Sequence, residues 1–244
     1  MCGRYVIAKA SADLVSSTGA DWASETLWNP SYNIAPTTTV PIIVERLVED
    51  QLLTELHLAK WGLIPPWAKD EKVGVRAFNA RSETVTEKPT FKNPIRSQRC
   101  ALPADGYYEW LKHSDNSKTP YYTSPANPEE MIYFAGIYQW WKTPENQWLL
   151  SCSMLTMYSP SAEDPDPVLA ELATLHHRIP IALHKDFVPT WIQPEKLSLP
   201  ETEALVEEAQ VGCFDVARTW KLQEVDRAVG NVRNNTPELI APVK

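Results

Sequence analysis

The sequence predicts an α+β fold, a single domain with a curved antiparallel β-barrel-like sheet and peripheral helices. Short segments in which apolar and polar residues alternate fill the first two-thirds of the chain, and most are separated by short turns. Helical patterns are scattered among these segments and become frequent after them. Neither a strand–helix alternation nor a glycine-rich phosphate loop occurs, which argues against a nucleotide-cofactor enzyme. The domain is expected to span residues 1–244, with its core at about residues 2–240.

The strand predictions rest on alternating or continuous apolar runs rich in β-branched and aromatic residues. They cover residues 4–8, 39–47, 52–62, 119–124, 131–142 and 147–159. The polar turn Glu49-Asp50-Gln51 would join two of them as a hairpin. Residues 99–112 contain Asp105-Gly106 between apolar residues, a pattern typical of a second hairpin.

Helices are predicted where apolar residues recur at three- and four-residue intervals. They cover residues 11–17, 82–88, 161–173, 184–192 and 201–209. Ser11 is the expected N-cap of the first. The spacing of Ser82 and Val85 fits a capping box only loosely, so the second helix has the weakest support.

The charge distribution is uneven. The chain has a net charge of −8, which argues against non-specific binding of nucleic acid by the whole surface. Residues 60–110 nevertheless carry nine Lys or Arg against six Asp or Glu. This basic stretch fits either a bounded phosphate-binding groove or a solvated face, and charge alone does not decide between them.

The cysteines and the N-terminus indicate the compartment. Cys2, Cys100, Cys152 and Cys213 lie far apart without a CxxC pair, so we expect neither a zinc site nor a disulfide framework. The N-terminus lacks a secretory signal, and no segment approaches the roughly 20 apolar residues of a membrane span. We therefore expect a cytoplasmic protein with free thiols and without a metal, a cofactor or a membrane partner.

Cys2 has special chemistry if Met1 is removed, as commonly happens before small residues. A terminal cysteine carries an α-amine of pKa about 7.7–8.0 beside a thiol of pKa about 8.5, so both nucleophiles are partly reactive near neutral pH. The amine and an aldehyde give a Schiff base, and the thiol then closes a five-membered thiazolidine. Gly3 would let a partner approach closely, and Arg4 adds a cation that would depress the thiol pKa or hold a phosphate. On position alone, a cysteine that merely follows a retained methionine is the alternative.

Seven motifs together resemble the SRAP family, the abasic-site processing proteins formerly called SOS-response-associated peptidases. They are MCGRYV (1–6), YNIAPT (32–37), WGLIPPWAKD (61–70), FNARSET (78–84), ALPADGYYEW (101–110), LHHRIP (175–180) and DRAVGNVRN (226–234). The resemblance runs from residue 2 to about residue 240 and implies a single α+β domain around a barrel-like sheet. It also implies loss of Met1, which explains the peptidase label, and a thiazolidine between Cys2 and the ring-opened sugar of an abasic site in single-stranded DNA. Family members support slow reversal of this crosslink.

The resemblance implies three further catalytic residues. Asn79 would orient the amine or the sugar hydroxyls, Glu109 would transfer protons, and His176 would protonate the sugar ring oxygen. The family has an acidic residue after this histidine, whereas His177 follows here. His177 is therefore a rival, although alignment through Arg178 favours His176.

The resemblance also implies the DNA contacts. Arg4, Arg81 and Arg178 match phosphate-binding positions, and guanidinium groups suit phosphate recognition. Trp67 matches an apolar wedge beside the lesion, with packing after two prolines as its alternative. The expected partner is single-stranded DNA with abasic sites, bound by a monomer that associates with the nucleoid.

Three other functions remain open on the sequence. Glutamine amidotransferases also begin Met-Cys-Gly, which makes an N-terminal-nucleophile amidohydrolase one alternative. A thiol peptidase that pairs Cys2 with His176 or His177 is the second. A DNA-binding module without covalent chemistry is the third, and the acidic net charge weighs against it.

Overall fold

Five strands close into a barrel at the centre of the protein, whose computed structural model describes residues 2–243. They are β4 (Thr39–Val48), β5 (Gln51–Trp61), β7 (Arg99–Ala104), β10 (Ile132–Lys142) and β11 (Trp148–Tyr158). Antiparallel pairs run in the order β5–β4–β7–β10–β11. A parallel pair between β11 and β5, through Ser151↔Lys60 and Cys152↔Trp61, closes the ring. This barrel and its surrounding helices confirm the predicted fold class.

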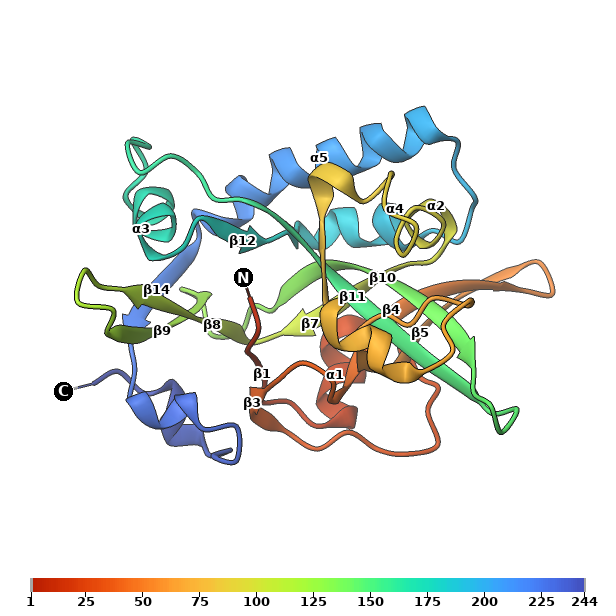
Figure 1. Ribbon diagram of the computed structural model, residues 1–244, viewed down its shortest axis with the longest axis horizontal. Helices are drawn as coiled ribbons and strands as arrows, with labels where there is room; N and C mark the ends of the chain where they lie inside the picture. Colours follow the sequence, from red (N-terminus) through yellow and green to blue (C-terminus); the bar gives the residue numbers. More distant parts are fainter. Residues whose placement is uncertain (1, 244) are drawn as a thin grey trace.

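A second, five-stranded sheet lies beside the barrel, with β8, β9 and β14 at the left of Figure 1. Its order is β14–β9–β8–β1–β3. The strands are β1 (Tyr5–Ile7), β3 (Ser31–Ile34), β8 (Gly106–Lys112), β9 (Lys118–Pro125) and β14 (Trp220–Glu224). Four short strands extend the barrel sheet: β2 (Asp21–Trp22), β6 (Asn79–Arg81), β12 (Arg178–Pro180) and β13 (Ala182–Leu183).

Helices surround the strands. The α-helices are α1 (Ser11–Thr18), α2 (Pro94–Ser97), α3 (Pro167–Leu175), α4 (Val188–Ile192) and α5 (Leu199–Ala217). The short 3-10 helices are η1 (Glu71–Arg76), η2 (Ser82–Thr84), η3 (Lys185–Phe187), η4 (Arg227–Gly230) and η5 (Pro237–Ile240). Figure 1 shows α2, α4 and α5 together on one side of the barrel and α1 on the other. A capping box between Ser198 and Glu201 fixes the start of α5.

A chain of aromatic rings joins the two sheets. Tyr5 meets Trp61 and Phe134 edge to face, with ring centroids 5.0 and 6.4 Å apart. Tyr107 meets Phe134 at 5.9 Å and Trp220 at 5.8 Å in the same manner. Such pairs stabilise a core beyond the apolar area that they bury. Cys2 belongs to the same buried cluster.

The predicted β4–β5 hairpin is confirmed. Its two turn residues, Glu49 and Asp50, have φ values of 48° and 62°. Two left-handed residues between paired strands are typical of a type I′ turn, whose twist matches that of the strands. The Val48↔Gln51 pair flanks the turn.

The predicted hairpin at Asp105-Gly106 is wrong, because β7 lies in the barrel sheet and β8 in the other sheet. Asp105 instead accepts the backbone N–H of Ala8 and pairs with Lys9 Nζ, both at 2.6 Å. A Cβ on Gly106 would come within 2.5 Å of the Tyr122 ring. The glycine therefore permits a close approach between strands at a passage from one sheet to the other.

Two helix starts also differ from the prediction. Ala10, not Ser11, is the N-cap of α1, because the Ser11 hydroxyl bonds the backbone of Trp28 instead. The helix predicted from residue 161 begins at Pro167, where Asp166 accepts the N–H groups of Val168 and Leu169.

The remaining helical segments differ in extent. Within residues 82–88 only Ser82–Thr84 are helical, as one 3-10 turn, and Ser82 donates to Thr156 O at 3.1 Å rather than capping a helix. The segment at 184–192 is divided between η3 and α4. The helix predicted at 201–209 is α5, which continues to Ala217.

Candidate active site around Cys2

Cys2 lies buried where the N-terminus enters β1, with an exposed fraction of 1%. β1 pairs β8 through Tyr5↔Tyr107, so the residues before Tyr5 run beside the continuation of β8 toward Glu109. Met1, whose removal the sequence predicts, lies outside the described residues.

Asn79 holds the backbone of Cys2. β6 brings it alongside β11 in the parallel pair Met154↔Asn79. Its Nδ2 donates to Cys2 O at 2.7 Å across 77 residues of sequence. The Oδ1 atom of the same amide is buried and has no hydrogen-bond partner among residues 2–243. An unpaired buried acceptor is costly, so the amide is prepared to receive a donor near Cys2.

Glu109 supplies the negative charge of the site. It lies in β8 opposite Tyr121 and is 7% exposed. Burial raises the pKa of the Cys2 thiol well above its usual range, and the charge of Glu109 raises it further. The sequence allowed for a lowering of the thiol pKa by Arg4, but the surroundings of Cys2 raise this pKa and favour the protonated thiol.

His176 lies directly after α3, two residues before β12, and is half-buried. Burial lowers its pKa, and the charge of Glu109 opposes this shift. Its Nδ1 lies 3.0 Å from Arg178 N and 3.1 Å from Arg178 O, so it accepts from the N–H or donates to the carbonyl according to the tautomer of the ring. His177 is exposed, and the centroid of its ring lies 4.3 Å from that of the His176 ring. The negative charge of Glu109 acts on the pKa of His176.

Arg178 is held inside the protein. Its side chain is 2% exposed and pairs with Glu83 at 2.9 Å. It also donates to Thr156 O at 2.8 Å, and its guanidinium lies 4.8 Å from the centre of the Tyr158 ring. In this conformation the group stabilises the segment that carries His176 and does not reach the surface.

Arg4 is also engaged internally. Its Nη1 donates to Asn33 Oδ1 at 2.6 Å and to Val229 O at 2.8 Å. Its Nη2 donates to Gly230 O at 3.2 Å, and the guanidinium lies 5.8 Å from the Trp110 ring. It thereby fastens the carbonyl end of η4 to the N-terminal strand.

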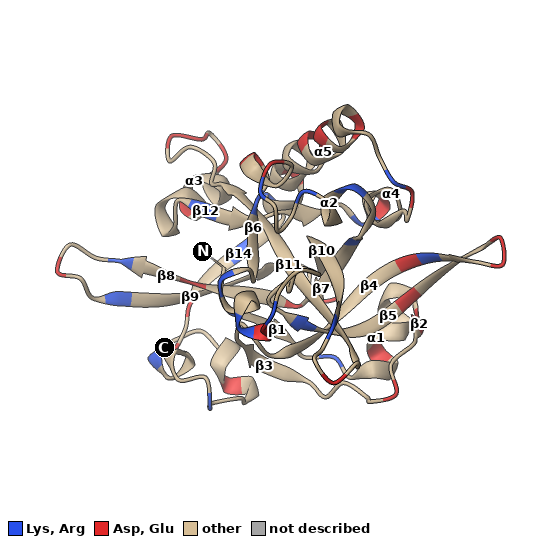
Figure 2. Cartoon of the chain, turned by 45° about the vertical axis from the view of Figure 1, so that its right-hand side comes forward, with Lys and Arg blue, Asp and Glu red and all other residues tan. Residues whose placement is uncertain are grey.

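Arg81 and Trp67 are exposed, in contrast to the other two arginines. Trp67 has 62% of its surface accessible, on the segment between β5 and η1. Trp141 Nε1 donates to Ala68 O at 2.9 Å and anchors this segment to β10. Figure 2 shows Lys and Arg on several segments around the N-terminus, whereas Asp and Glu mark the tip of the β4–β5 hairpin and α5.

The structure thus brings together Cys2, Asn79, Glu109 and His176 from four distant segments. Sequence reasoning missed Glu83 and Asn33, which hold Arg178 and Arg4. Glu83 lies in the motif FNARSET and Asn33 in the motif YNIAPT, so membership of these motifs could have marked both residues as candidates.

Two further observations concern metals and membranes. Within residues 2–243, no three His, Cys, Asp or Glu side chains lie together in a way that would hold a metal ion. Over the same residues, no helix has the length and apolar character needed to cross a bilayer. The four cysteines are free and buried.

Known proteins resemble this chain over nearly its whole length. It is 33% identical to the abasic site processing protein YoqW of Bacillus subtilis over 241 residues, which cover 98% of this chain and 99% of the relative. It is 30% identical to the abasic site processing protein HMCES of Pongo abelii, over 91% of this chain and 68% of the relative. A crystal structure of a Bacteroides thetaiotaomicron protein shares the fold, with a TM-score of 0.77 at 23% identity and full coverage of both chains. Residues 1–232 match the family described as SOS response associated peptidase (SRAP), and the chain therefore belongs to the SRAP family.

Proposed function

We propose that this protein processes abasic sites in single-stranded DNA by capturing the lesion covalently through Cys2 after Met1 is removed. The names of YoqW and HMCES support the class of lesion. The α-amine of Cys2 adds to the aldehyde of the ring-opened sugar, and loss of one water gives an imine. The thiol then adds across the imine, with sulfur bound to carbon and the proton passed to nitrogen, and closes the thiazolidine.

The hydrogen bond from Asn79 to Cys2 is the observation that carries the proposal. A half-buried amide that reaches across the fold to hold the carbonyl of residue 2 fixes the amine on the neighbouring carbon. The unpaired Oδ1 of the same amide supports a role as acceptor for an N–H of that amine.

The charge of Glu109 acts on both the Cys2 thiol and the His176 ring. We assign to Glu109 the proton transfers of imine formation, ring closure and slow reversal. We assign to His176, rather than His177, the proton exchange with the sugar ring oxygen. The contacts of Nδ1 with the backbone of Arg178 support this role, because they fix the orientation of the ring.

The DNA contacts are proposed for Arg81, Trp67, Arg4 and Arg178. Exposure supports Arg81 as a phosphate ligand and Trp67 as a wedge against a base. Contact between Arg178 and a phosphate would require its guanidinium to leave Glu83, so a DNA phosphate competes with a carboxylate for it. We further propose that the protein acts as a monomer, in the cytoplasm and at the nucleoid.

Intact mass spectrometry tests the proposal, before and after incubation with an oligonucleotide that contains one abasic site. We expect a chain lacking Met1 and an adduct of the oligonucleotide less one water. Cys2→Ala should form only a Schiff base, which survives denaturation only after borohydride reduction. Cys213→Ala, which removes a buried thiol outside the site, should behave like the wild type.

A stable adduct on a chain that keeps Met1, or on Cys2→Ala without reduction, would overturn the proposal. Hydrolysis of glutamine would instead support the amidohydrolase alternative, and turnover of peptides in trans would support the thiol peptidase. Wild-type binding without any adduct would support a DNA-binding module.

A further inference from the structure

The β4–β5 hairpin extends beyond the barrel and leaves one of its edges without a partner strand (Figure 1). β4 pairs β5 along its whole length. On its other side β4 meets β7 at the single pair Ile43↔Ala101. From Val44 to Val48, that side of β4 therefore pairs with no strand among residues 2–243. An unpaired edge presents backbone N–H and C=O groups that another extended chain can bind.

One face of this hairpin carries an exposed apolar patch. Because side chains alternate along a strand, Ile43, Glu45 and Leu47 of β4 lie on the same face. The register places Leu52 opposite Leu47 and Thr54 opposite Glu45, so these two residues of β5 belong to it as well. We call these five residues the hairpin face. Leu47 is 61% exposed and Leu52 is 58% exposed, which suits a contact with another protein.

A pocket of about 410 Å³ lies at the base of the hairpin face. Ile43, Glu45 and Thr54 line it from the hairpin, and Val188 and Ile192 line it from α4. Glu45 Oε2 is buried and has no hydrogen-bond partner among residues 2–243, and burial raises the pKa of this carboxyl group. A lysine or arginine side chain would satisfy the carboxylate while its aliphatic stem packs on the apolar wall.

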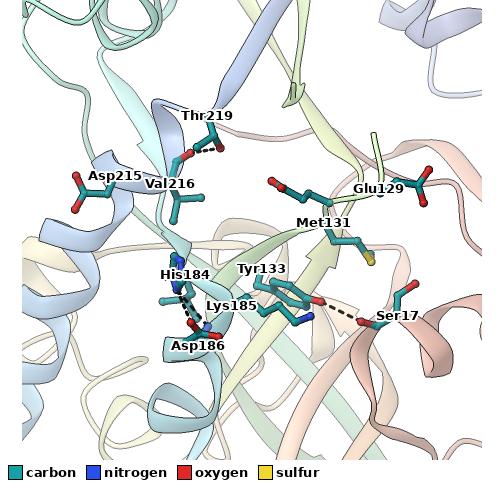
Figure 3. A pocket seen from close by; sticks show the side chains of 12 residues that line it. Ser17, Glu129, Met131, Tyr133, His184, Lys185, Asp186, Asp215, Val216 and Thr219 are labelled. Atoms are coloured by element: carbon teal, nitrogen blue, oxygen red, sulfur yellow. Dashed lines mark hydrogen bonds and ion pairs between the residues drawn. The ribbon is translucent and has the colours of Figure 1, made fainter. Parts of the chain in front are cut away.

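A second pocket, of about 690 Å³, continues from the first, because Tyr133, Lys185 and Asp186 line both (Figure 3). Five Asp or Glu side chains line the two pockets together: Glu45, Glu129, Glu130, Asp186 and Asp215. Arg218 pairs with Asp215. Among the described residues, Lys185 is the one Lys or Arg on the lining of either pocket. The groove is therefore acidic and favours a basic partner.

The opposite face of the hairpin has its charges paired within the protein. Arg46 donates to Glu55 through Nε at 2.6 Å and through Nη2 at 2.9 Å. His57 Nε2 lies 2.9 Å from the same carboxylate. The hydrogen bonds from Arg46 lower the pKa of Glu55 to about 2. The unpaired acceptor of Glu45 and the exposed leucines thus lie together on the hairpin face.

We propose that the hairpin face and the two pockets bind an extended segment of a partner protein in which a lysine or arginine stands next but one to an apolar residue. The segment adds to the free edge of β4 as a further strand. Its apolar side chain rests on Leu47 and Leu52, and its cationic side chain reaches Glu45.

The charges of the hairpin argue against two other occupants. An acidic groove repels the phosphates of a nucleic acid. Two copies of this chain, paired through their β4 edges, would bring together hairpins whose tips both carry Glu49 and Asp50 (Figure 2). Like charges that face each other across paired strands are destabilising. A basic partner has neither cost.

The test selects short random peptides, displayed on phage, for binding to the full chain. We expect the enriched peptides to have a lysine or arginine next but one to an apolar residue. These peptides are synthesised with a fluorescent label, and anisotropy gives their affinity for each variant. The double variant Leu47→Ala, Leu52→Ala should bind about tenfold more weakly, and Glu45→Gln several-fold more weakly. Lys185→Gln should bind more tightly, because it removes a cation from the acidic lining.

Two matched variants serve as controls, and circular dichroism verifies the folding of every variant. Leu27→Ala removes a leucine that is 67% exposed on another segment. Glu207→Gln removes an exposed carboxylate of α5. Both should bind the peptides like the wild type. Bound peptide should also slow hydrogen exchange of backbone amides within residues 44–48, because an added strand bonds that edge.

Failure to enrich any peptide, or enrichment of peptides without basic residues, would overturn the proposal. Equal losses of affinity in the control variants would also overturn it, because the binding would then be general attraction to an acidic protein. Unchanged exchange in residues 44–48 would overturn the added strand. Dimerisation of the free chain, seen by light scattering and lost in the double leucine variant, would assign the hairpin face to a second copy instead.

Discussion

At the scale of single residues, the Cys2 thiol is protected rather than activated. Burial and then the charge of Glu109 raise its pKa, although sequence reasoning allowed for a depressed value. A thiol held in its protonated form favours an order of events in which the amine attacks first. The thiol then adds to the more electrophilic imine carbon. The same carboxylate therefore suppresses unwanted thiol chemistry and serves the proposed proton transfers.

The charge of Glu109 can be tested at the thiol itself. Glu109→Gln removes the negative charge with little change of shape, so the pKa of Cys2 should fall and alkylation by iodoacetamide should become several-fold faster. A shift of one pKa unit changes the thiolate fraction about tenfold. Peptide mass spectrometry after timed labelling measures the rate. Cys213 is an internal reference, because burial alone raises its pKa to about 12. Equal or slower labelling of Cys2 would contradict the electrostatic role.

His176 should make stability depend on pH. Its pKa in the folded protein is lowered from 6.5, chiefly by burial. Below about pH 6.5 the unfolded chain therefore binds more protons at this residue than the folded chain, so stability falls as the pH drops toward the folded pKa. Solvent screening of the half-buried ring keeps this contribution modest. Urea unfolding at pH 5 and pH 7.5 should show a smaller difference for His176→Gln than for wild type, and an unchanged difference would contradict it.

At the scale of elements, sequence patterns predicted those strands and turns whose structure depends mainly on neighbouring residues. The patterns at residues 39–47 and 52–62 predicted β4 and β5, although burial in β4 is continuous from Val40 to Val44 and does not alternate between two faces. The Asp105-Gly106 pattern failed, because contacts with Ala8 and Lys9 fix that corner from outside. β6 has only three residues and no period of its own, so only its pairing with β11 makes it a strand.

Gly106→Ala should destabilise the protein, because the new methyl group would approach the Tyr122 ring within 2.5 Å and Thr123 O within 2.6 Å. Overpacking of this kind typically costs about 1–3 kcal/mol. Gly212→Ala in α5 is the matched control, since nothing lies within 4 Å of its Cβ position. A helical glycine replaced by alanine should gain about 0.5–1 kcal/mol. Chemical unfolding of both variants measures the contrast, and equal stabilities would contradict the close approach.

At the scale of the whole molecule, the sequence named candidate site residues but could not predict how they are arranged. The motifs named Cys2, Asn79, Glu109 and His176, but their spacing carries no information about the bond from residue 79 to residue 2. Arginines look alike in a sequence. Tertiary partners such as Glu83 decide which of them is buried and which is left to solvent.

The first and last parts of the chain are tied together by Asn33. Its Nδ2 donates to Val229 O, Asn231 O and Asn234 O at 3.2, 3.1 and 2.9 Å, and its Oδ1 accepts from Arg4. Asn33→Ala would remove these four hydrogen bonds. Val229 O and Asn231 O would keep bonds from Arg4 and from the Asn234 N–H, whereas Asn234 O would lose the bond from Asn33, so we expect a cost of about 1–3 kcal/mol.

Hydrogen exchange should locate this loss in residues 226–240, with faster exchange there than in β10 and β11. Asn127→Ala is a control, because Asn127 makes exposed contacts of its own loop. Uniformly faster exchange across the barrel would contradict a local tie between the two ends.

The parallel β5–β11 contact has a consequence for how the protein is made. β11 touches β5, β6, β10 and β12, and it ends at Tyr158. On the ribosome, residue 2 emerges first, yet the strand that aligns Asn79 is completed only after residue 158 has been translated. His176 follows later still. Cys2 is thus among the earliest residues synthesised and among the last to acquire its neighbours in the site. The candidate active site therefore cannot assemble until most of the nascent chain has left the ribosomal tunnel.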